Sequence, residues 1–406
     1  MLHYDVVVIG SGPAGEHGAV QAASYGKRVA LVEKEAVPGG ASANTGTIPS
    51  KALRETALAI QQARSRDAHG IEFKVSEQVT VPELMGRRGL VTAREHSRIR
   101  ARLTHAGVEM FRGLASFVDA HTIRITVADG SFTDVQADVV LLATGTRPAH
   151  PTQYPFDHQR VYDSDSILML DTVPRSLAIL GGGVAGCEYA SIFAALGVHV
   201  SIIDSKPRLL PWLDAELSLA MQDAFSDAGI DMYQQLRATK LEVGDRDVLV
   251  TLSTGSRLVA EKVLVAAGRI GNVEALNLGA AGLGATERGY LEVDEHYRTK
   301  VPHIYAAGDL IGEAVGFLKV LASPQDGELL GVHCIGPHAS ELVHLGSAVM
   351  ALGGTIHYFT QATFNYPTLG EAYKYAAYDA RAQMKRVGAP GAQAQPPAVS
   401  VVPKTA

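Results

Sequence analysis

Near its N-terminus the chain reads Val6-Val7-Val8-Ile9-Gly10-Ser11-Gly12-Pro13-Ala14-Gly15, an apolar run that leads directly into a glycine-rich loop. Four apolar residues in succession are typical of a parallel strand that is buried on both faces. A helical stretch follows through Ala23, and a second strand, expected from Arg28 to Val32, ends at the acidic Glu33. A strand, a GxGxxG loop, a helix and a strand with a final acid together form the dinucleotide-binding βαβ pattern.

Each glycine of this loop has its own physical task in that pattern. Gly10 makes the tight turn out of the strand, Gly12 lets a pyrophosphate approach the backbone, and Gly15 lets the helix pack closely on the strand. The pyrophosphate lies at the positive end of the helix dipole. Glu33 accepts a hydrogen bond from an adenosine ribose. We therefore expect these residues to bind one dinucleotide.

The same pattern occurs a second time in the middle of the chain. Leu177 to Leu180 leads into Gly181-Gly182-Gly183-Val184-Ala185-Gly186, and a helix is expected to about Leu196. A strand expected from Val198 to Ile203 then ends at Asp204, at the same spacing from Gly181 as Glu33 has from Gly10. Two such sites in one chain predict that a flavin and a nicotinamide meet, because hydride passes between them. The second site is expected to use Gly181, Gly183 and Gly186.

The end of the second unit leaves the choice of nicotinamide open. Asp204 favours NAD, because its carboxylate accepts a hydrogen bond from a ribose 2′-hydroxyl. Lys206 and Arg208 follow closely and could instead hold the 2′-phosphate of NADP. Lys206 and Arg208 therefore have two alternative interpretations. They belong either to a site that binds both NAD and NADP or to an ordinary solvated loop.

Composition excludes several other classes of protein. The chain has 406 residues and a net charge of −6, which argues against a nucleic-acid-binding protein. Cys187 and Cys334 are its only cysteines, too few for a disulfide framework or a structural zinc site, and they suit a reducing cytoplasm. No apolar run is long enough to span a membrane, and the N-terminus lacks the basic region of a signal peptide. The histidines form no HxH or HExxH pattern, so we expect no metal site.

Two further motifs resemble the remaining flavin signatures of the pyridine nucleotide–disulfide oxidoreductases. They are Ala143-Thr144-Gly145-Thr146-Arg147-Pro148 and Ile304-Tyr305-Ala306-Ala307-Gly308-Asp309. This resemblance implies that the first glycine loop binds FAD and the second binds NAD(P). It implies that Asp309 binds the flavin ribitol and that Ala143, Thr144 and Gly145 also bind FAD, with Gly145 where the chain leaves the FAD domain. It also implies that Gly268 binds NAD(P), at the strand end that closes the NAD(P) domain.

Within that family the chain is most similar to the soluble pyridine nucleotide transhydrogenases. The similarity rests on the stretches Asn44–Lys51, Tyr162–Ile167, Glu188–Phe193 and Phe364–Thr368. It implies that Gly46, Thr47 and Lys51 lie at the flavin, with Lys51 and Glu188 together beside flavin N5 and the nicotinamide. A cation at that place favours a reduced, anionic flavin. Tyr366 and Glu371 are the corresponding catalytic candidates near the C-terminus.

The departures from the family concern its dithiol chemistry. Ser42 and Thr47 stand where disulfide reductases carry two cysteines, and neither side chain can form a disulfide. Tyr366 stands where those enzymes have a histidine, although its partner Glu371 is retained. A tyrosine hydroxyl, with a pKa of about 10, is a poor proton shuttle at neutral pH. What remains is FAD-dependent hydride transfer between NADPH and NAD⁺, with a dihydrolipoamide dehydrogenase-like enzyme as the alternative.

The fold we expect is α/β, with two doubly wound, Rossmann-type dinucleotide-binding domains and a shortened α+β interface domain. The FAD domain is predicted over 1–155 and 281–312, the NAD(P) domain over 156–280, the interface domain over 317–387, and a disordered tail over 388–406. Only Leu310 to Gly316 separate the Gly-Asp motif from the interface hairpin, where the family has a further helix and strands. This shortening weakens the expected homodimer and raises a third alternative, a non-catalytic nucleotide-binding protein.

Overall fold

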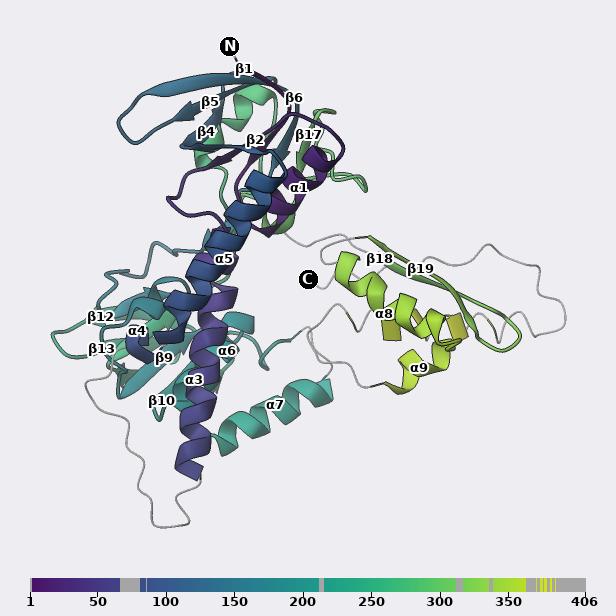
Figure 1. The fold of residues 1–406 in the computed structure, drawn as a ribbon. Coiled ribbons are helices and arrows are strands. Elements are labelled where there is room, and N and C mark those ends of the chain that lie inside the picture. Colours follow the sequence, from purple (N-terminus) through teal and green to yellow (C-terminus); the bar gives the residue numbers. More distant parts are fainter. Residues whose placement is uncertain are drawn as a thin grey trace. The chain divides into compact units, whose positions relative to one another are not determined.

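A computed structural model describes residues 2–65, 81–84, 86–211, 215–311, 317–335 and 339–362, together with 370, 373–374, 376–377, 380–381 and 384. Its contacts divide the chain into two units, Met1–Gly312 and Glu313–Ala406 (Figure 1). The first unit contains both glycine-rich loops, and each unit is described by itself below.

The first loop belongs to a mainly parallel sheet in the order β3-β2-β1-β6-β5-β4, with β17 beside β6. Its strands are β1 (Leu2–Ile9), β2 (Val29–Glu33), β3 (Glu109–Arg112), β4 (Leu114–Phe117), β5 (Thr122–Thr126), β6 (Phe132–Leu142) and β17 (Ile304–Ala306). β1 pairs in parallel with both β2 and β6. Val7 and Val8 are fully buried, which confirms the expectation from the apolar run.

Helices lie between these strands in the chain. They are α1 (Pro13–Ser24), α2 (Gly40–Asn44), α3 (Thr47–Ser65), α4 (Val81–Leu84) and α5 (Gly86–His105), and α1 packs against β1, β2 and β6. The helices expected over 49–65 and 91–107 are present as α3 and α5, whereas α2 was not predicted. In Figure 1, α3 and α5 run as long rods, and contacts join the two helices.

The second loop belongs to a fully parallel sheet in the order β11-β10-β9-β15-β8. Its strands are β8 (Val161–Asp163), β9 (Ser176–Leu180), β10 (His199–Asp204), β11 (Asp231–Gln234) and β15 (Lys262–Val265). The helices α6 (Val184–Ala195) and α7 (Ala215–Asp227) belong to the same segment. Between β11 and β15 the chain forms an antiparallel meander of β12 (Ala238–Val243), β13 (Val248–Leu252) and β14 (Arg257–Ala260).

A small two-stranded ladder joins the segments that leave the two parallel sheets. β7 (Thr146–Pro148) follows β6, and β16 (Arg269–Gly271) follows β15. The two strands pair antiparallel, with Thr146 opposite Gly271. Short 3-10 turns are also present, of which η5 contacts β16: η2 (Ser166–Met169), η3 (Glu274–Leu276), η4 (Leu278–Ala281) and η5 (Gly308–Ile311).

The second unit contains a hairpin and helices. β18 (Phe317–Ala322) and β19 (Leu329–Ile335) pair antiparallel, and α8 (Ala339–Ala351) and α9 (Ile356–Gln361) follow. Leu318, Leu329, Ile356 and Phe359 belong to its buried core. The hairpin, and the helix α8 that ends before Gly353, confirm the elements predicted from the sequence. The predicted tail 388–406 and most of the helix predicted over 370–386 lie outside the described residues.

The parallel sheets confirm the α/β class, while the predicted domain boundaries stay a prediction. Among the described residues, no helix is both long and apolar enough to cross a membrane. The same part of the chain holds no group of three or more His, Cys, Asp or Glu side chains that could bind a metal.

Candidate active site

The first glycine loop has the shape that a bound pyrophosphate requires. Gly10 has a φ of 102°, and a Cβ on Gly15 would overlap the carbonyl oxygen of Gly10, so α1 packs directly on its own strand. A Cβ on Gly12 would meet only Gly40 Cα, at 3.9 Å, so there is space over the start of α1. Gly12 is the N-cap of α1 and contributes no side chain there. The positive end of the helix is therefore open to an anion.

Glu33 ends β2 beside this loop, and its carboxylate is already oriented. Its Oε2 accepts hydrogen bonds from the backbone N–H of Ser11, at 2.9 Å, and from the Ser11 hydroxyl. Its Oε1 accepts one from Glu35 N, at 2.9 Å. A small cavity adjoins the carboxylate, lined by Glu33, Glu35, Ala36, Pro38, Arg100, Met110, Phe111 and Arg112. This arrangement fits the adenosine end of a dinucleotide, whose ribose hydroxyls are hydrogen-bond donors.

The second loop repeats this geometry. Gly181 has a φ of 118°, and a Cβ on Gly186 would overlap the carbonyl oxygen of Gly181. A Cβ on Gly183, the N-cap of α6, would find no atom within 4 Å. Asp204 accepts from Gly182 N at 2.6 Å, as Glu33 accepts from Ser11 N. The structure therefore gives both loops the same fit to a dinucleotide.

Lys206 and Arg208, which follow Asp204, differ in burial and in their hydrogen bonds. The second oxygen of the Asp204 carboxylate accepts from Lys206 N at 2.9 Å, and the Lys206 side chain is exposed. The half-buried Arg208 donates from Nη2 to the carbonyl of Pro211, at 3.0 Å. Asp204 is thus the acidic group at the end of this strand, with the Lys206 cation close by in sequence.

Lys51 and Glu188 come together as the family resemblance implies. Lys51 Nζ lies 2.8 Å from Glu188 Oε1, although the two residues are far apart in sequence. Lys51 lies on α3 and Glu188 on α6, and contacts join these helices. The Ser50 hydroxyl also donates to Glu188 Oε1, at 3.3 Å. The ion pair joins a helix of the first nucleotide unit to the helix that starts at the second glycine loop.

Ser42 and Thr47, which stand where disulfide reductases have cysteines, lie on either side of the turn between α2 and α3. Ser42 lies on α2, Gly46 lies in the turn, and Thr47 begins α3. Ser42 lines a cavity of about 150 Å³ with Pro13, Glu16, His17, Gly39, Ala43, Ile48, Glu95, Arg98, Ile99 and Arg102.

The Cys187 thiol is buried on α6, and that burial, with the nearby Asp204 carboxylate, raises its pKa to about 12. Cys187 is therefore unsuited to thiolate chemistry at neutral pH.

Residues of the two further flavin motifs meet around the β7–β16 ladder. Ala143 and Gly145 follow β6, and Gly145 has a φ of 63°. The Thr144 hydroxyl donates to Asn272 O at 2.8 Å, and Asn272 Nδ2 donates back to Thr144 O at 2.9 Å. Gly268, with a φ of 92°, precedes β16 and accepts from Ala149 N. These bonds fix the path of the chain between the two parallel sheets.

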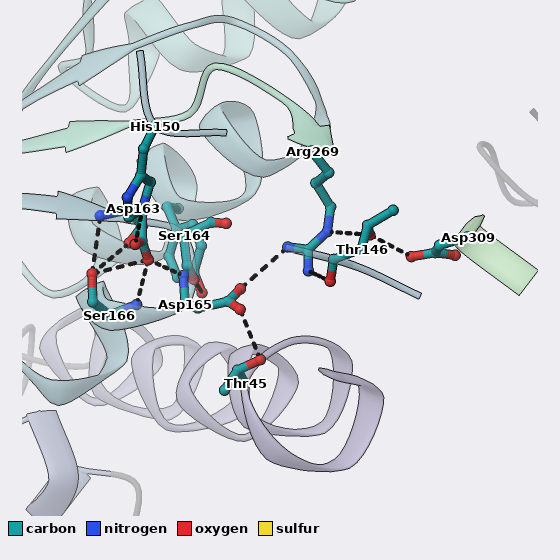
Figure 2. Close-up of polar contacts among 10 residues, drawn as sticks. Thr45, Thr146, His150, Asp163, Ser164, Asp165, Ser166, Arg269 and Asp309 are labelled. Carbon is teal, nitrogen blue, oxygen red and sulfur yellow. Dashed lines mark hydrogen bonds and ion pairs between the residues drawn. The ribbon is translucent and has the colours of Figure 1, made fainter. Parts of the chain in front are cut away.

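Asp309 is part of a polar network with Thr146, Arg269 and Asp165. The sequence motifs include Thr146 and Asp309, but they did not predict this contact. Figure 2 shows Asp309 within reach of Thr146, whose hydroxyl lies 3.1 Å from Asp309 Oδ2. The Arg269 guanidinium contacts both Thr146 and Asp165. No periodicity or spacing places these side chains together, because their partners are distant in sequence.

The remaining catalytic candidates, Tyr366 and Glu371, lie outside the described residues. Their predicted roles therefore stay predictions from the family resemblance.

Comparison with known proteins supports the same grouping. The sequence model of the pyridine nucleotide-disulphide oxidoreductases matches residues 4–327. A soluble pyridine nucleotide transhydrogenase of Mycobacterium tuberculosis (strain ATCC 25177 / H37Ra) is 35% identical over 461 residues, which cover 95% of this chain and 98% of that protein. One from Pseudomonas syringae pv. tomato is 35% identical over 459 residues, covering 93% and 98%. Both alignments are longer than the 406-residue chain, so these relatives contain residues without a counterpart here.

Solved structures are similar in fold. LpdA from Mycobacterium tuberculosis has a TM-score of 0.74 at 23% identity and covers 93% of this chain and 99% of its own. The HOCl-induced flavoprotein disulfide reductase RclA from Escherichia coli, in a Cu(II) complex, has a TM-score of 0.71 at 22% identity, with the same coverage.

Proposed function

The chain belongs to the pyridine nucleotide-disulphide oxidoreductase family, and we propose that it is an FAD-dependent transhydrogenase that passes hydride between NADPH and NAD⁺. The observation that carries this proposal is the pair of matching glycine loops within one unit. Ser42 and Thr47 support it, because they remove the dithiol that a disulfide reductase needs.

FAD is assigned to the first loop. Gly10, Gly12 and Gly15 would hold its pyrophosphate at the start of α1, and Glu33 would accept a ribose hydroxyl. The other residues of this site are Gly46, Thr47, Lys51, Ala143, Thr144, Gly145 and Asp309. Bound FAD supplies a ring that accepts hydride from one nicotinamide and gives it to another.

The nicotinamide nucleotides are assigned to the second loop. Gly181, Gly183 and Gly186 would bind the pyrophosphate at the start of α6. Asp204 would bind the ribose of NAD(H), and Lys206 and Arg208 would accommodate the 2′-phosphate of NADP(H). Gly268 would close the site at the end of the sheet. One site thus serves both nucleotides in turn.

Lys51 is assigned an electrostatic role. Its ammonium group pairs with Glu188 at 2.8 Å, which fixes the cation between α3 and α6. A fixed cation at the place where negative charge develops lowers the free energy of the charged state. Glu188 is the residue that positions it.

Assembly and location are proposed from the family resemblance. We assign the chain to the cytoplasm and to a homodimer whose interface domain is shortened after Asp309. Light scattering of the purified protein tests the dimer, because a mass near that of one chain would contradict it.

A second candidate function is nucleotide binding without catalysis. The short connection from Leu310 to Gly316, and relatives whose alignments exceed the length of this chain, favour it. Retention of NAD(P) with no uptake of FAD under any reconstitution would support this candidate against the first. The dihydrolipoamide dehydrogenase-like alternative is tested with dihydrolipoamide and NAD⁺, and we expect no NADH to form.

Steady-state kinetics test the transhydrogenase directly. Because both nucleotides use one site in turn, the first product leaves before the second substrate binds. Double-reciprocal plots with varied NADPH at several fixed concentrations of an NAD⁺ analogue should therefore give parallel lines. Lines that converge would contradict the shared site.

A further inference from the structure

A continuous chain of hydrogen bonds and ion pairs runs from α2 to the flavin motif after β17. It starts at Thr45, whose hydroxyl donates to Asp165 Oδ2 at 3.0 Å. Asp165 Oδ1 lies 3.2 Å from Arg269 Nη1, Arg269 Nε lies 2.8 Å from Thr146 Oγ1, and Thr146 Oγ1 lies 3.1 Å from Asp309 Oδ2. Figure 2 shows these contacts one after another, from Thr45 through Asp165, Arg269 and Thr146 to Asp309.

The members of this chain belong to elements of both parallel sheets. Asp165 follows β8, the edge strand of the second sheet, and Arg269 begins β16, which follows β15 of that sheet. Thr146 begins β7 after β6 of the first sheet, and Asp309 follows β17, which pairs with β6. The helix at the second glycine loop reaches the same place, because Tyr189 on α6 donates to Ser164 O at 2.8 Å.

The direction of each hydrogen bond is fixed by chemistry. A guanidinium group only donates, so Thr146 Oγ1 must accept from Arg269 Nε. The hydroxyl hydrogen of Thr146 is then free to donate to Asp309 Oδ2, which can only accept when ionised. Arg269 Nη2 also donates to the Thr146 carbonyl, at 2.9 Å, so the arginine holds Thr146 at two atoms. Thr146 is buried, so water competes little for these bonds.

We propose that Thr146 and Arg269 are positioning residues that orient the Asp309 carboxylate for FAD, and that the ion pair with Asp165 makes FAD affinity depend on the nicotinamide-binding sheet. The proposal rests on the assignment of FAD to the first loop. With Oδ2 held by Thr146, Asp309 Oδ1 is the oxygen that receives a hydroxyl of the cofactor. Asp165 neutralises Arg269, so that the guanidinium orients Thr146 instead of pairing with Asp309 itself.

The first test measures the FAD dissociation constant of the apoprotein by the change in flavin fluorescence. Thr146→Val keeps the shape of the side chain and removes the hydroxyl, and we expect it to weaken FAD binding about tenfold. Thr146→Ser restores the hydroxyl and should bind within about threefold of the wild type. Thr299→Val is the matched control, because Thr299 is equally buried and its hydroxyl donates to Ile304 O at 2.8 Å.

The control separates positioning from a loss of stability. We expect Thr299→Val to lower the thermal midpoint at least as much as Thr146→Val and to leave the FAD dissociation constant within about twofold. Equal FAD affinity in Thr146→Val and the wild type would overturn the proposal. An equal loss of affinity in Thr146→Val and Thr299→Val would also overturn it.

The second test is a double-mutant cycle on FAD binding. Asp165→Asn should weaken FAD binding about fivefold when Thr146 is present and should have no further effect in Thr146→Val, because both changes interrupt one path. Independent, additive losses would overturn the link to the second sheet. Wild-type protein that takes up FAD but fails to transfer hydride would contradict the proposed function and leave these affinity comparisons valid.

Discussion

The carboxylate of Asp204 accepts a hydrogen bond from the backbone N–H of Gly182, at 2.6 Å. The bond orients the acid at the end of β10 toward the loop that starts α6, as the bond from Ser11 N orients Glu33 at the end of β2. The two nucleotide units are therefore alike in the orientation of their acids as well as in their glycines. This likeness is the physical basis for the expected binding of two dinucleotides.

Asp204→Asn should change the preference between the two nicotinamides. The substitution removes a negative charge that repels a 2′-phosphate, and it weakens the acceptor for a 2′-hydroxyl. We expect NADH to bind about tenfold more weakly, while NADPH binds as well as before or better. Calorimetric titration of both nucleotides measures the ratio. Asp231→Asn, at an exposed acid of the neighbouring strand β11, is the control. An unchanged ratio in Asp204→Asn would contradict the role of this carboxylate.

Two glycines of the second loop should respond in opposite ways to alanine. Gly186→Ala places a methyl group into the carbonyl of Gly181, so we expect it to destabilise the fold by about 3 kcal/mol. Gly183→Ala has free space and a φ of −78°, so its thermal midpoint should stay near that of the wild type. The methyl group of Gly183→Ala nevertheless blocks the approach of a pyrophosphate, so NADPH binding should fall at least about tenfold. Normal NADPH binding by a stable Gly183→Ala would show that the loop does not hold the nucleotide.

Lys51→Met should slow hydride transfer with little change in stability. The Lys51 side chain is 56% exposed, so its ion pair with Glu188 contributes below about 1 kcal/mol to folding. Loss of the cation removes charge stabilisation at the reacting ring, and we expect the rate to fall about 10- to 100-fold. Stopped-flow loss of the flavin band after mixing with NADPH measures this rate.

Two matched variants complete that experiment. Lys51→Arg keeps the charge and should recover much of the rate. Lys240→Met breaks a comparable exposed pair with Glu242, at 2.9 Å, and should leave the rate unchanged. A rate for Lys51→Met within about twofold of the wild type would remove Lys51 from the mechanism, given the magnitudes expected for fixed charges.

The Cys187 thiol should resist alkylation in the folded protein. Its pKa of about 12 leaves it protonated at pH 8, and it is buried. We expect iodoacetamide to label it only after unfolding, as measured by mass spectrometry with and without denaturant. Because the pKa is raised in the folded state, this thiol also makes the protein less stable as pH rises above about 9, where the unfolded thiol ionises. Rapid labelling of native Cys187 at pH 8 would contradict this account.

Local patterns were sufficient to predict both nucleotide units. The apolar runs, the glycine spacing and the acids at strand ends are each encoded within about thirty residues, the length of one βαβ unit. The structure gives β1, α1 and β2, and later β9, α6 and β10, close to the expected bounds. The pairing of Lys51 with Glu188 was expected only through the family resemblance, because nothing in either segment alone specifies its partner.

Contacts between distant segments could not be predicted in this way. The Thr146–Asp309 bond forms because Thr146 follows β6 and Asp309 follows β17, and only the sheet order reveals that these two strands are neighbours. The short helix α2 begins at Gly40, which has a φ of 57°, a conformation that helix propensity does not anticipate. Glu16 is nearly fully buried on α1 and lies 3.0 Å from Arg102 on α5, a tertiary pair that neither helix pattern specifies.

The visible absorption spectrum of the purified protein tests the central claim most directly. The protein is incubated with FAD, freed of excess cofactor, and treated anaerobically with NADPH and then with NAD⁺. The account predicts a flavin band that is lost with NADPH and returns with NAD⁺. A protein that retains no flavin band, or whose band is unchanged by NADPH, would contradict it.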